Sequence, residues 1–172
     1  QIALLTFHFP PHLGPVSAQF AAELELLIRS RYPLICVVSH EESRVQELVT
    51  ALAEKRGKKV YEWSCCTGLV AGGTNLQSRR SHAAGTRDPL AALEVILDHV
   101  EPALFLFKDL HPFLDRQHPQ VIRRLKDIAL HLKHSLKTVI LVGPVLEAPP
   151  ELEKELTILP LPLPGETELG EL

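Results

Sequence analysis

An apolar, β-branched run, Leu34–Val38, stands directly before a helical pattern, and this junction constrains the fold more than any other stretch. The run has the length of a buried strand. Ser39, with Glu42 three residues later, forms the pattern of a capping box at a helix N-terminus. The helix expected over Glu41–Arg56 carries one apolar stripe, and Gly57 is placed to end it. The sequence therefore predicts a strand followed at once by a helix.

The same junction is where a phosphate-binding loop would lie, with the pattern G-x-x-x-x-G-K-[ST]. Glycines in such a loop let backbone N–H groups approach a phosphate, and the lysine neutralises its charge. Here the junction holds neither Gly nor Lys, and Glu41 and Glu42 occupy the first helical turn. Carboxylates there favour the helix dipole and repel a phosphate. We therefore interpret the junction as a closed nucleotide site in a degenerate P-loop-like core without a Walker A loop.

Further strand-like runs alternate with helical patterns along the chain. The expected strands are 59–64, 103–107, 138–142 and 157–163, and the expected helices are 17–30, 88–101, 119–135 and a short one over 149–155. Asp88 before Pro89 is a good start for a helix, and Pro160 and Pro162 confine the last strand to an edge. The pattern predicts a three-layer α/β domain with a mostly parallel five-stranded sheet. Because the elements follow the order of an AAA core, we predict the strand order 5-1-4-3-2.

Composition narrows the class of protein. With 172 residues, 45% of them apolar and 23% charged, the chain suits one soluble globular domain with a sizeable core. No apolar run approaches roughly eighteen residues and no charged-then-apolar leader opens the chain, so we expect neither a membrane span nor a signal peptide. The net charge of −3 gives no general attraction to nucleic acid.

The three cysteines, Cys36, Cys65 and Cys66, argue against a disulfide framework, because vicinal cysteines rarely pair and Cys36 falls inside an expected buried strand. A reducing, cytoplasmic-type compartment is the natural interpretation. Cys65 and Cys66 lack a base that the sequence can identify, so the sequence gives no support for nucleophilic catalysis.

One long irregular stretch, Thr67–Arg87, interrupts the alternation of strands and helices. It contains Arg79, Arg80 and Arg87, and it is either a binding loop or a mobile surface loop. We divide the chain into an N-terminal arm (1–16), a degenerate AAA-like domain (17–163) and an acidic linker (164–172).

The strand expected over 103–107 leads into Lys108 and Asp109, as a Walker B strand leads into a magnesium-binding Asp. Leu110 and His111 follow where a catalytic Glu would stand, so the general base is missing. Asp109 with His111 and Asp115 forms either an acid/base set or a cap on the turn at Pro112. An acidic residue after a buried strand is common, and we assign no catalytic residue to this segment.

The sequence also contains candidate residues for a metal site and for a nucleic-acid interface. The histidines that fall within one segment are His111, His118, His131 and His134, but no Cys or carboxylate lies at a recognisable ligand spacing, so we assign no metal site. The basic residues of the loop and of the long helix are Arg79, Arg80, Arg87, Arg123, Arg124 and Lys126. Both stretches lack aromatic residues for base stacking, so nucleic acid is not an expected partner, although a nucleic-acid-binding module stays an alternative.

Five blocks of sequence resemble the N-terminal region of a family of AAA ATPases from cyanobacteria and plastids, known as a hypothetical chloroplast reading frame. The blocks are ELELLIRSRYPLICVVSHEESRV, DPLAALEVIL, ALFLFKDLHPFLD, VIRRLKDIALHLK and KTVILVGPVLEAPPELEKELTILPLPLP. The resemblance spans roughly 23–164 and is weakest over 1–22 and 67–87. It implies that this N-terminal domain precedes a separate AAA module with the Walker motifs, which binds ATP and magnesium and through which the protein oligomerises.

The resemblance implies a non-catalytic domain that regulates a larger ATPase or recognises its target, in the cytoplasm or the plastid stroma. A link to photosynthesis or inorganic-carbon use, proposed for the family, is part of this expectation. The expected partners are the protein's own ATPase module and an unidentified protein target, with no cofactor in this segment. The candidate interaction residues are Arg79, Arg80, Arg87, Lys108, Asp109, His111 and Asp115. The alternative of another class is a nucleotide-binding domain that uses Asp109.

Overall fold

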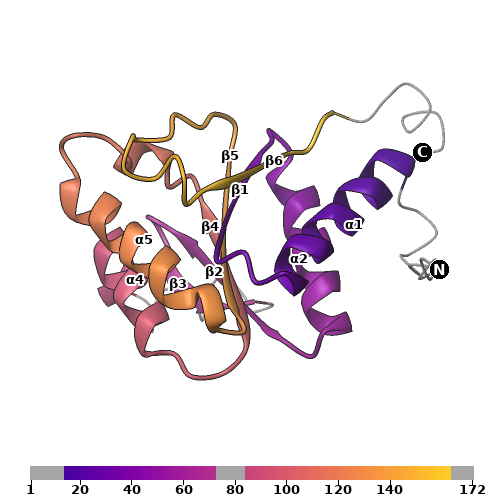
Figure 1. Ribbon diagram of the computed structural model, residues 1–172, viewed down its shortest axis with the longest axis horizontal. Helices are drawn as coiled ribbons and strands as arrows, with labels where there is room; N and C mark the ends of the chain where they lie inside the picture. The colour runs from indigo at the N-terminus through magenta and orange to yellow at the C-terminus, as the bar shows by residue number, and fades with distance from the viewer. Residues whose placement is uncertain (1–13, 73–83, 164–172) are drawn as a thin grey trace.

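The computed structural model describes residues 14–72 and 84–163 (Figure 1). The expected linker at 164–172, most of the expected arm and the candidate residues Arg79 and Arg80 lie outside these ranges. None of the described helices is long and apolar enough to cross a membrane.

The centre of the fold is a mostly parallel sheet. Its strands are β1 (Leu34–Val38), β2 (Lys59–Ser64), β3 (Gly68–Ala71), β4 (Ala103–Lys108), β5 (Lys137–Gly143) and β6 (Thr157–Pro160). The strands lie in the order β3-β2-β4-β5-β1-β6, and only the β2–β3 pair is antiparallel. The predicted order 5-1-4-3-2 is confirmed from β6 to β2, with β6 on an edge. The structure adds β3 beyond β2 as a sixth strand.

Helices cover both faces of the sheet, as Figure 1 shows. They are α1 (Pro15–Arg29), α2 (Glu42–Lys55), α4 (Pro89–Asp98) and α5 (Pro119–His131), with short 3₁₀ helices over Ala84–Thr86, His111–Phe113 and Leu132–His134. Helices α1 and α2 pack on one face, and α4 and α5 pack on the other. The predicted three-layer α/β architecture is therefore confirmed.

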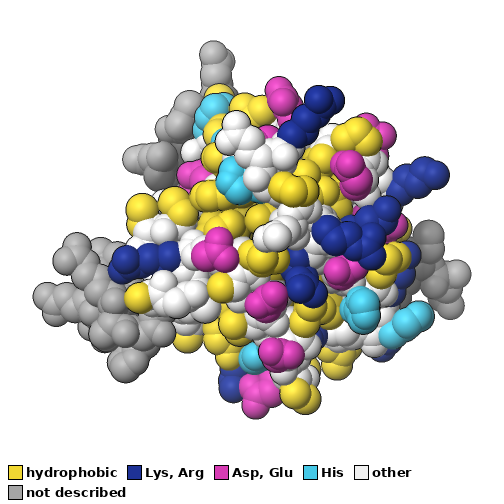
Figure 2. All heavy atoms as spheres, turned by 90° about the vertical axis from the view of Figure 1, so that its left-hand side faces the viewer, with side chains coloured by type: hydrophobic (Ala, Val, Ile, Leu, Met, Phe, Trp, Pro, Cys, Tyr) yellow, Lys and Arg dark blue, Asp and Glu magenta, His cyan; other side chains and the backbone are white. Residues whose placement is uncertain are grey.

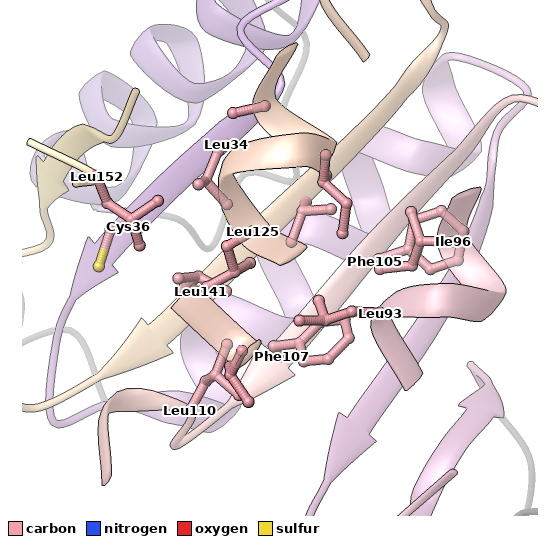
Figure 3. Packing of buried hydrophobic residues seen from close by; sticks show 14 of the residues in the cluster. Leu34, Cys36, Leu93, Ile96, Phe105, Phe107, Leu110, Leu125, Leu141 and Leu152 are labelled. Atoms are coloured by element: carbon pink, nitrogen blue, oxygen red, sulfur yellow. The ribbon is translucent and has the colours of Figure 1, made fainter. Parts of the chain in front are cut away.

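The two cores on either side of the sheet follow from the alternation of side chains along each strand. In β4, Phe105 and Phe107 face α4 and α5, whereas Leu104 and Leu106 face α1 and α2. Figure 3 shows the first of these cores, where Phe107 lies near Leu93 and Phe105 lies near Ile96, both residues of α4. Because both faces are covered, β4 is apolar throughout its buried length.

Two helix ends follow the predicted chemistry. Asp88 caps α4, since its Oδ2 accepts a hydrogen bond of 3.1 Å from the Ala91 N–H. Gly57 follows α2 with a φ of 63°, and the N–H groups of Gly57 and Lys58 donate to the carbonyls of Glu54 and Ala53. These two bonds form a Schellman motif, in which glycine takes the left-handed position without strain.

The predicted capping box is wrong. Helix α2 begins at Glu42, and Ser39 Oγ instead accepts a hydrogen bond of 3.0 Å from the Glu41 N–H, two residues on. Ser39 still belongs to the end of the sheet, because its own N–H donates to the Gly143 carbonyl at 2.9 Å. The hydroxyl therefore closes a turn before the helix and does not reach the helix itself.

Three predicted segments differ in detail. The stretch 67–87 is not wholly irregular, because Gly68–Ala71 pairs with β2 to form a hairpin. The predicted helix over 149–155 is a series of turns, with hydrogen bonds such as Leu152 N–H to Pro149 O. Helix α4 ends at Asp98, three residues before the predicted end, because Pro102 lies just ahead of β4 and the chain must become extended.

Candidate functional site

The carboxyl ends of β1, β2, β4 and β5 meet at one edge of the sheet, where parallel α/β proteins usually bind ligands. Ser39 follows β1, and Lys108 ends β4. The sequence-derived candidates Lys108, Asp109 and His111 therefore fall at this edge. We call it the carboxyl edge.

Arg44, in the first turn of α2, ties the strand-to-helix junction to neighbouring elements. Its Nε donates to Ser17 Oγ at 2.9 Å, and one of its guanidinium nitrogens, Nη1, lies 2.6 Å from Glu41 Oε2. The same nitrogen donates to the Pro162 carbonyl at 3.5 Å. One side chain thus joins α1, the strand-to-helix junction and the segment after β6, and it is itself largely buried.

Two backbone donors of the junction also have acceptors within the chain. The N–H groups of Ser39 and Glu41 donate to Gly143 O and to Ser39 Oγ. A phosphate entering here would have to displace these bonds and lie beside the carboxylates of Glu41 and Glu42. The junction therefore holds the chain together through its own contacts, and it lacks the glycines and the lysine with which a P-loop cradles a phosphate.

Lys108 lies beside the junction and holds a buried carboxylate. Its Nζ donates to Gln46 Oε1 at 2.6 Å and lies 3.6 Å from a carboxylate oxygen of both Glu62 and Glu42. Glu62 is buried on β2, so the charge of Lys108 compensates a carboxylate that has left water. Lys108, Glu62 and Glu42 line a cavity of about 280 Å³, together with Asp109. Lys108 thus has a structural role that the sequence interpretation did not include.

Asp109 has a strained backbone and an exposed side chain. Its φ of 53° is unusual for a residue other than glycine, and its N–H donates to Val142 O at 3.0 Å. The nearest His111 ring nitrogen, Nδ1, lies 4.0 Å from Asp109 Oδ1, beyond hydrogen-bond distance. That nitrogen is buried against Gly143, where an added Cβ would lie 3.0 Å from it.

Asp115 pairs with a different histidine. His118 Nδ1 lies 2.7 Å from Asp115 Oδ1, and this hydrogen bond holds the pKa of Asp115 below its usual value. The same oxygen accepts from the Gln117 N–H at 2.9 Å. Asp115 therefore caps a turn ahead of α5, on the rim of a cavity of about 600 Å³ between that helix and residues 147–151.

The other basic candidates do not form a patch of one sign among the described residues. Arg87 is exposed, Arg123 pairs with Asp127 at 2.8 Å and Arg124 with Glu94 at 3.2 Å. Figure 2 shows lysine and arginine side chains interspersed with acidic ones over the side of the molecule that carries α4 and α5. Within residues 14–72 and 84–163, no cluster of three or more His, Cys, Asp or Glu side chains could hold a metal ion.

The cysteines differ sharply in accessibility. Cys65 and Cys66 are exposed at the tip of the β2–β3 hairpin, whereas Cys36 is buried in β1. Burial raises the pKa of the Cys36 thiol to about 12. Burial, followed by a hydrogen bond with Cys66, also raises the pKa of Cys65. A raised pKa lowers the thiolate fraction, so Cys65 lacks the activation of a catalytic cysteine.

We expect a thiol-specific disulfide reagent at pH 8 to modify Cys65 and Cys66 in the folded chain and to leave Cys36 unmodified. The reason is that the reactive species is an accessible thiolate. The measurement is the number of thiols titrated before and after unfolding in urea, which should rise from two to three. Three fast-reacting thiols in the folded protein would contradict the burial of Cys36.

Comparison with known proteins places this geometry in a family context. Residues 20–161 match a family model described as SpoVK-like AAA ATPase, N-terminal domain. The chain is 36% identical, over 154 residues, to an uncharacterized AAA domain-containing protein, ycf46, of Trieres chinensis, which covers 88% of this chain and 29% of that protein. This chain is also 33% identical to the ycf46 protein of Guillardia theta and 34% identical to that of Pyropia yezoensis, and each match covers 87% of this chain. The chain thus spans less than a third of the length of these relatives.

A solved structure shares the fold at low sequence identity. A chain in the structure of Drosophila ORC bound to AT-rich DNA and Cdc6 superposes with a TM-score of 0.51 and 8% identity. The match covers 90% of this chain and 59% of that one. This likeness concerns the fold alone, and it agrees with the AAA-like strand order of the sheet.

Proposed function

The chain belongs to the family of SpoVK-like AAA ATPase N-terminal domains, and from this we propose that it is a non-catalytic domain that recognises a protein target for, or regulates, a larger AAA ATPase. The resemblance read from the sequence blocks is thereby confirmed at the level of the family. In this proposal ATP and magnesium bind the AAA module of the whole protein and not this domain. The partners are that module and a protein target.

The observation that carries the proposal is the closed strand-to-helix junction. Arg44 ties it to Ser17, Glu41 and the Pro162 carbonyl, and the N–H groups of Ser39 and Glu41 already have acceptors. A fold that has the strand order of an AAA core but not its phosphate cradle keeps the scaffold and lacks the means to hold a nucleotide. Its surfaces are then available for recognition.

We expect calorimetric titration of the 172-residue chain with magnesium ATP, and separately with magnesium ADP, to give no heat of binding at millimolar nucleotide. The physical reason is that a phosphate at the junction would break existing hydrogen bonds and meet two carboxylates. A stoichiometric signal would contradict the proposal.

The Asp109→Ala variant separates the alternatives if a signal appears. If this chain binds magnesium through Asp109 as a Walker B strand does, the variant should abolish the signal. The matched control is Asp115→Ala, which removes a carboxylate near α5 whose partner is His118. Loss of binding in Asp109→Ala alone would establish the nucleotide-binding alternative.

The finer parts of the proposal rest on the family alone. They are a location in the cytoplasm or plastid stroma and a link to photosynthesis or inorganic-carbon use. For the nucleic-acid alternative, Arg87, Arg123 and Arg124 carry no described contact that favours it, and Arg79 and Arg80 lie outside the described residues.

A further inference from the structure

A basic pocket lies at the edge of the sheet opposite the carboxyl edge. Its lining includes Lys58, Pro102 and Leu136, which directly precede β2, β4 and β5, and Arg31, which lies three residues before the start of β1. Because these four strands are parallel, the segments that enter them meet at the same edge. The cavity measures about 400 Å³, within the range of ligand pockets. We call it the amino-edge pocket.

Four cations and no carboxylate line the amino-edge pocket. The cations are Arg29, Arg31, Arg56 and Lys58. Only Arg56 has a carboxylate partner among the described residues, the buried Glu25. The other described contacts of Arg31 and Lys58 are with backbone carbonyls, His134 O at 3.5 Å and Leu136 O at 3.0 Å. In a chain whose net charge is −3, this is a local excess of positive charge.

The cations are close enough to repel one another. The pKa of Lys58 is lowered by burial first, and then by the positive charges of Arg56 and Arg31. Like charges held close together disfavour their own ionised form, and of these three cations only Arg56 has a described carboxylate partner. An anion bound among them would relieve that repulsion.

The helix dipole does not account for the whole cluster. Cations near a helix C-terminus favour its negative end, and this explains Arg29 in the last turn of α1. Arg31 and Lys58 lie beyond the ends of α1 and α2, and their side chains bond carbonyls of the segment that leads into β5. Their positive ends therefore gather where a third element meets the two helices.

The backbone of Arg31 is strained, whereas the corresponding position after α2 is not. The N–H groups of Arg31 and Tyr32 donate to Ile28 O and Leu27 O, so α1 ends in the same Schellman motif as α2. Helix α2 has Gly57 in the left-handed position, whereas α1 has Arg31 there, with a φ of 60°. A side chain in this conformation is strained, and such strain concentrates at functional positions.

We propose that the amino-edge pocket binds an acidic segment of a protein partner, with Arg31 and Lys58 contacting its carboxylates. Arginine clusters recognise acidic motifs through charge-assisted, often bidentate, hydrogen bonds. Ile28, Pro102 and Leu136 add an apolar part to the lining that suits a peptide side chain. The lining has no aromatic side chain on which a nucleic-acid base could stack, which favours a peptide over an oligonucleotide. The inference deepens the proposed target recognition and rests on it.

The test is fluorescence anisotropy of a labelled octaglutamate peptide titrated with the 172-residue chain at low salt. The double variant Arg31→Gly with Lys58→Gln should raise the dissociation constant about tenfold or more, which corresponds to losing about 1.4 kcal/mol of binding free energy. The control double variant, Arg116→Gln with Lys126→Gln, removes the same charge from the side of α5 and should change binding less than about threefold. Equal losses in both double variants, or no binding by the wild type, would overturn the inference.

Glycine is chosen at position 31 so that the variant still folds. Glycine relieves the left-handed backbone, so Arg31→Gly alone should keep or raise the melting temperature while it weakens peptide binding. A single-stranded oligonucleotide or inorganic phosphate that binds more tightly than the peptide, with the same dependence on Arg31 and Lys58, would overturn the assignment to a protein partner. If neither the peptide nor the nucleotide binds the chain, this inference is overturned and the proposed function stands. A nucleotide signal that persists in the double variant overturns the proposed function instead.

Discussion

Replacing Phe105 with alanine is expected to lower the free energy of unfolding by about 3–5 kcal/mol, the usual loss for a large aromatic removed from a core. Phe105 is 0% exposed in the middle of β4. Its ring stacks on Tyr61 with centroids 5.3 Å apart and meets His99 edge-on at 5.4 Å. Deleting the ring leaves a cavity between the sheet and α4, which the surrounding side chains cannot fill without moving the strands. Urea unfolding followed by circular dichroism measures the loss.

The control for Phe105→Ala is Val100→Ala, close in the sequence but in contact with solvent. Val100 is 93% exposed after the end of α4, so its truncation should change stability by less than about 0.5 kcal/mol. The two variants share the substitution to alanine and differ in burial. A loss below about 1.5 kcal/mol for Phe105→Ala would contradict the packing of α4 and α5 on this face of the sheet.

The order of the central strands could be predicted because each carries a strong local signal. Leu34–Val38 and the run at 103–107 are nearly continuous apolar segments, and each is followed or preceded by a helix with a single apolar stripe. Such alternation leaves a parallel sheet with right-handed crossovers as the main solution. The AAA-like order then follows from the sequence of elements, and the structure confirms it.

Strand β3 was missed because it has little signal of its own. Gly68–Ala71 is only four residues long, begins with a glycine at a φ of 73° and follows the exposed turn at Cys65 and Cys66. Tertiary contacts hold it in place, since the Leu69 N–H donates to Thr86 Oγ1 at 2.8 Å. A contact across seventeen residues cannot be read from local periodicity.

The capping box failed for a related reason. The capping-box prediction rested only on the spacing of Ser39 and Glu42. A serine at this spacing can close a turn instead of capping a helix. Pairing of Ser39 with Gly143 extends the sheet by one residue, which moves the start of α2 beyond the reach of the serine hydroxyl.

The residues of the candidate site also differ in how strong a local signal each has in the sequence. Lys108 and Asp109 were found because they follow an apolar strand, but Glu62 was overlooked as one polar residue in a short strand. Glu62 lies between Tyr61 and Trp63 in β2, and it is buried in the structure. A carboxylate between two aromatic residues of a strand was the available sign that a cation must compensate it.

The amino-edge pocket also had a signal in the sequence. Arg31 precedes β1 and Lys58 precedes β2, and residues that enter parallel strands must gather at one edge. The sequence interpretation considered only the carboxyl ends of the strands, so it did not include the edge where the strands begin. Ser135 and Leu136 follow the same rule, because they lead into the parallel strand β5.

Replacing Lys137 with methionine is expected to lower the free energy of unfolding by about 2–3 kcal/mol, because it removes the donor for several backbone carbonyls at once, the buried one of Ile96 among them. Lys137 begins β5 and is almost wholly buried, and its Nζ donates to Ile96 O at 2.7 Å and His99 O at 2.6 Å. Burial lowers the pKa of this amine, and the nearby charge of Asp98 opposes the shift. The lysine thus ends α4 as a side-chain cap supplied by the sheet.

Methionine keeps most of the volume of the lysine side chain, so the loss in Lys137→Met reports the missing donor more than a cavity. The matched control is Lys133→Met, which removes a half-exposed amine 3.8 Å from Glu155 Oε2 and should cost less than about 1 kcal/mol. Hydrogen exchange adds a local readout, because the amides in the last turn of α4 should lose protection in Lys137→Met and keep it in Lys133→Met. Equal destabilisation by the two variants would mean that the carbonyls of Ile96 and His99 find water without Lys137, and that the end of α4 is open to solvent.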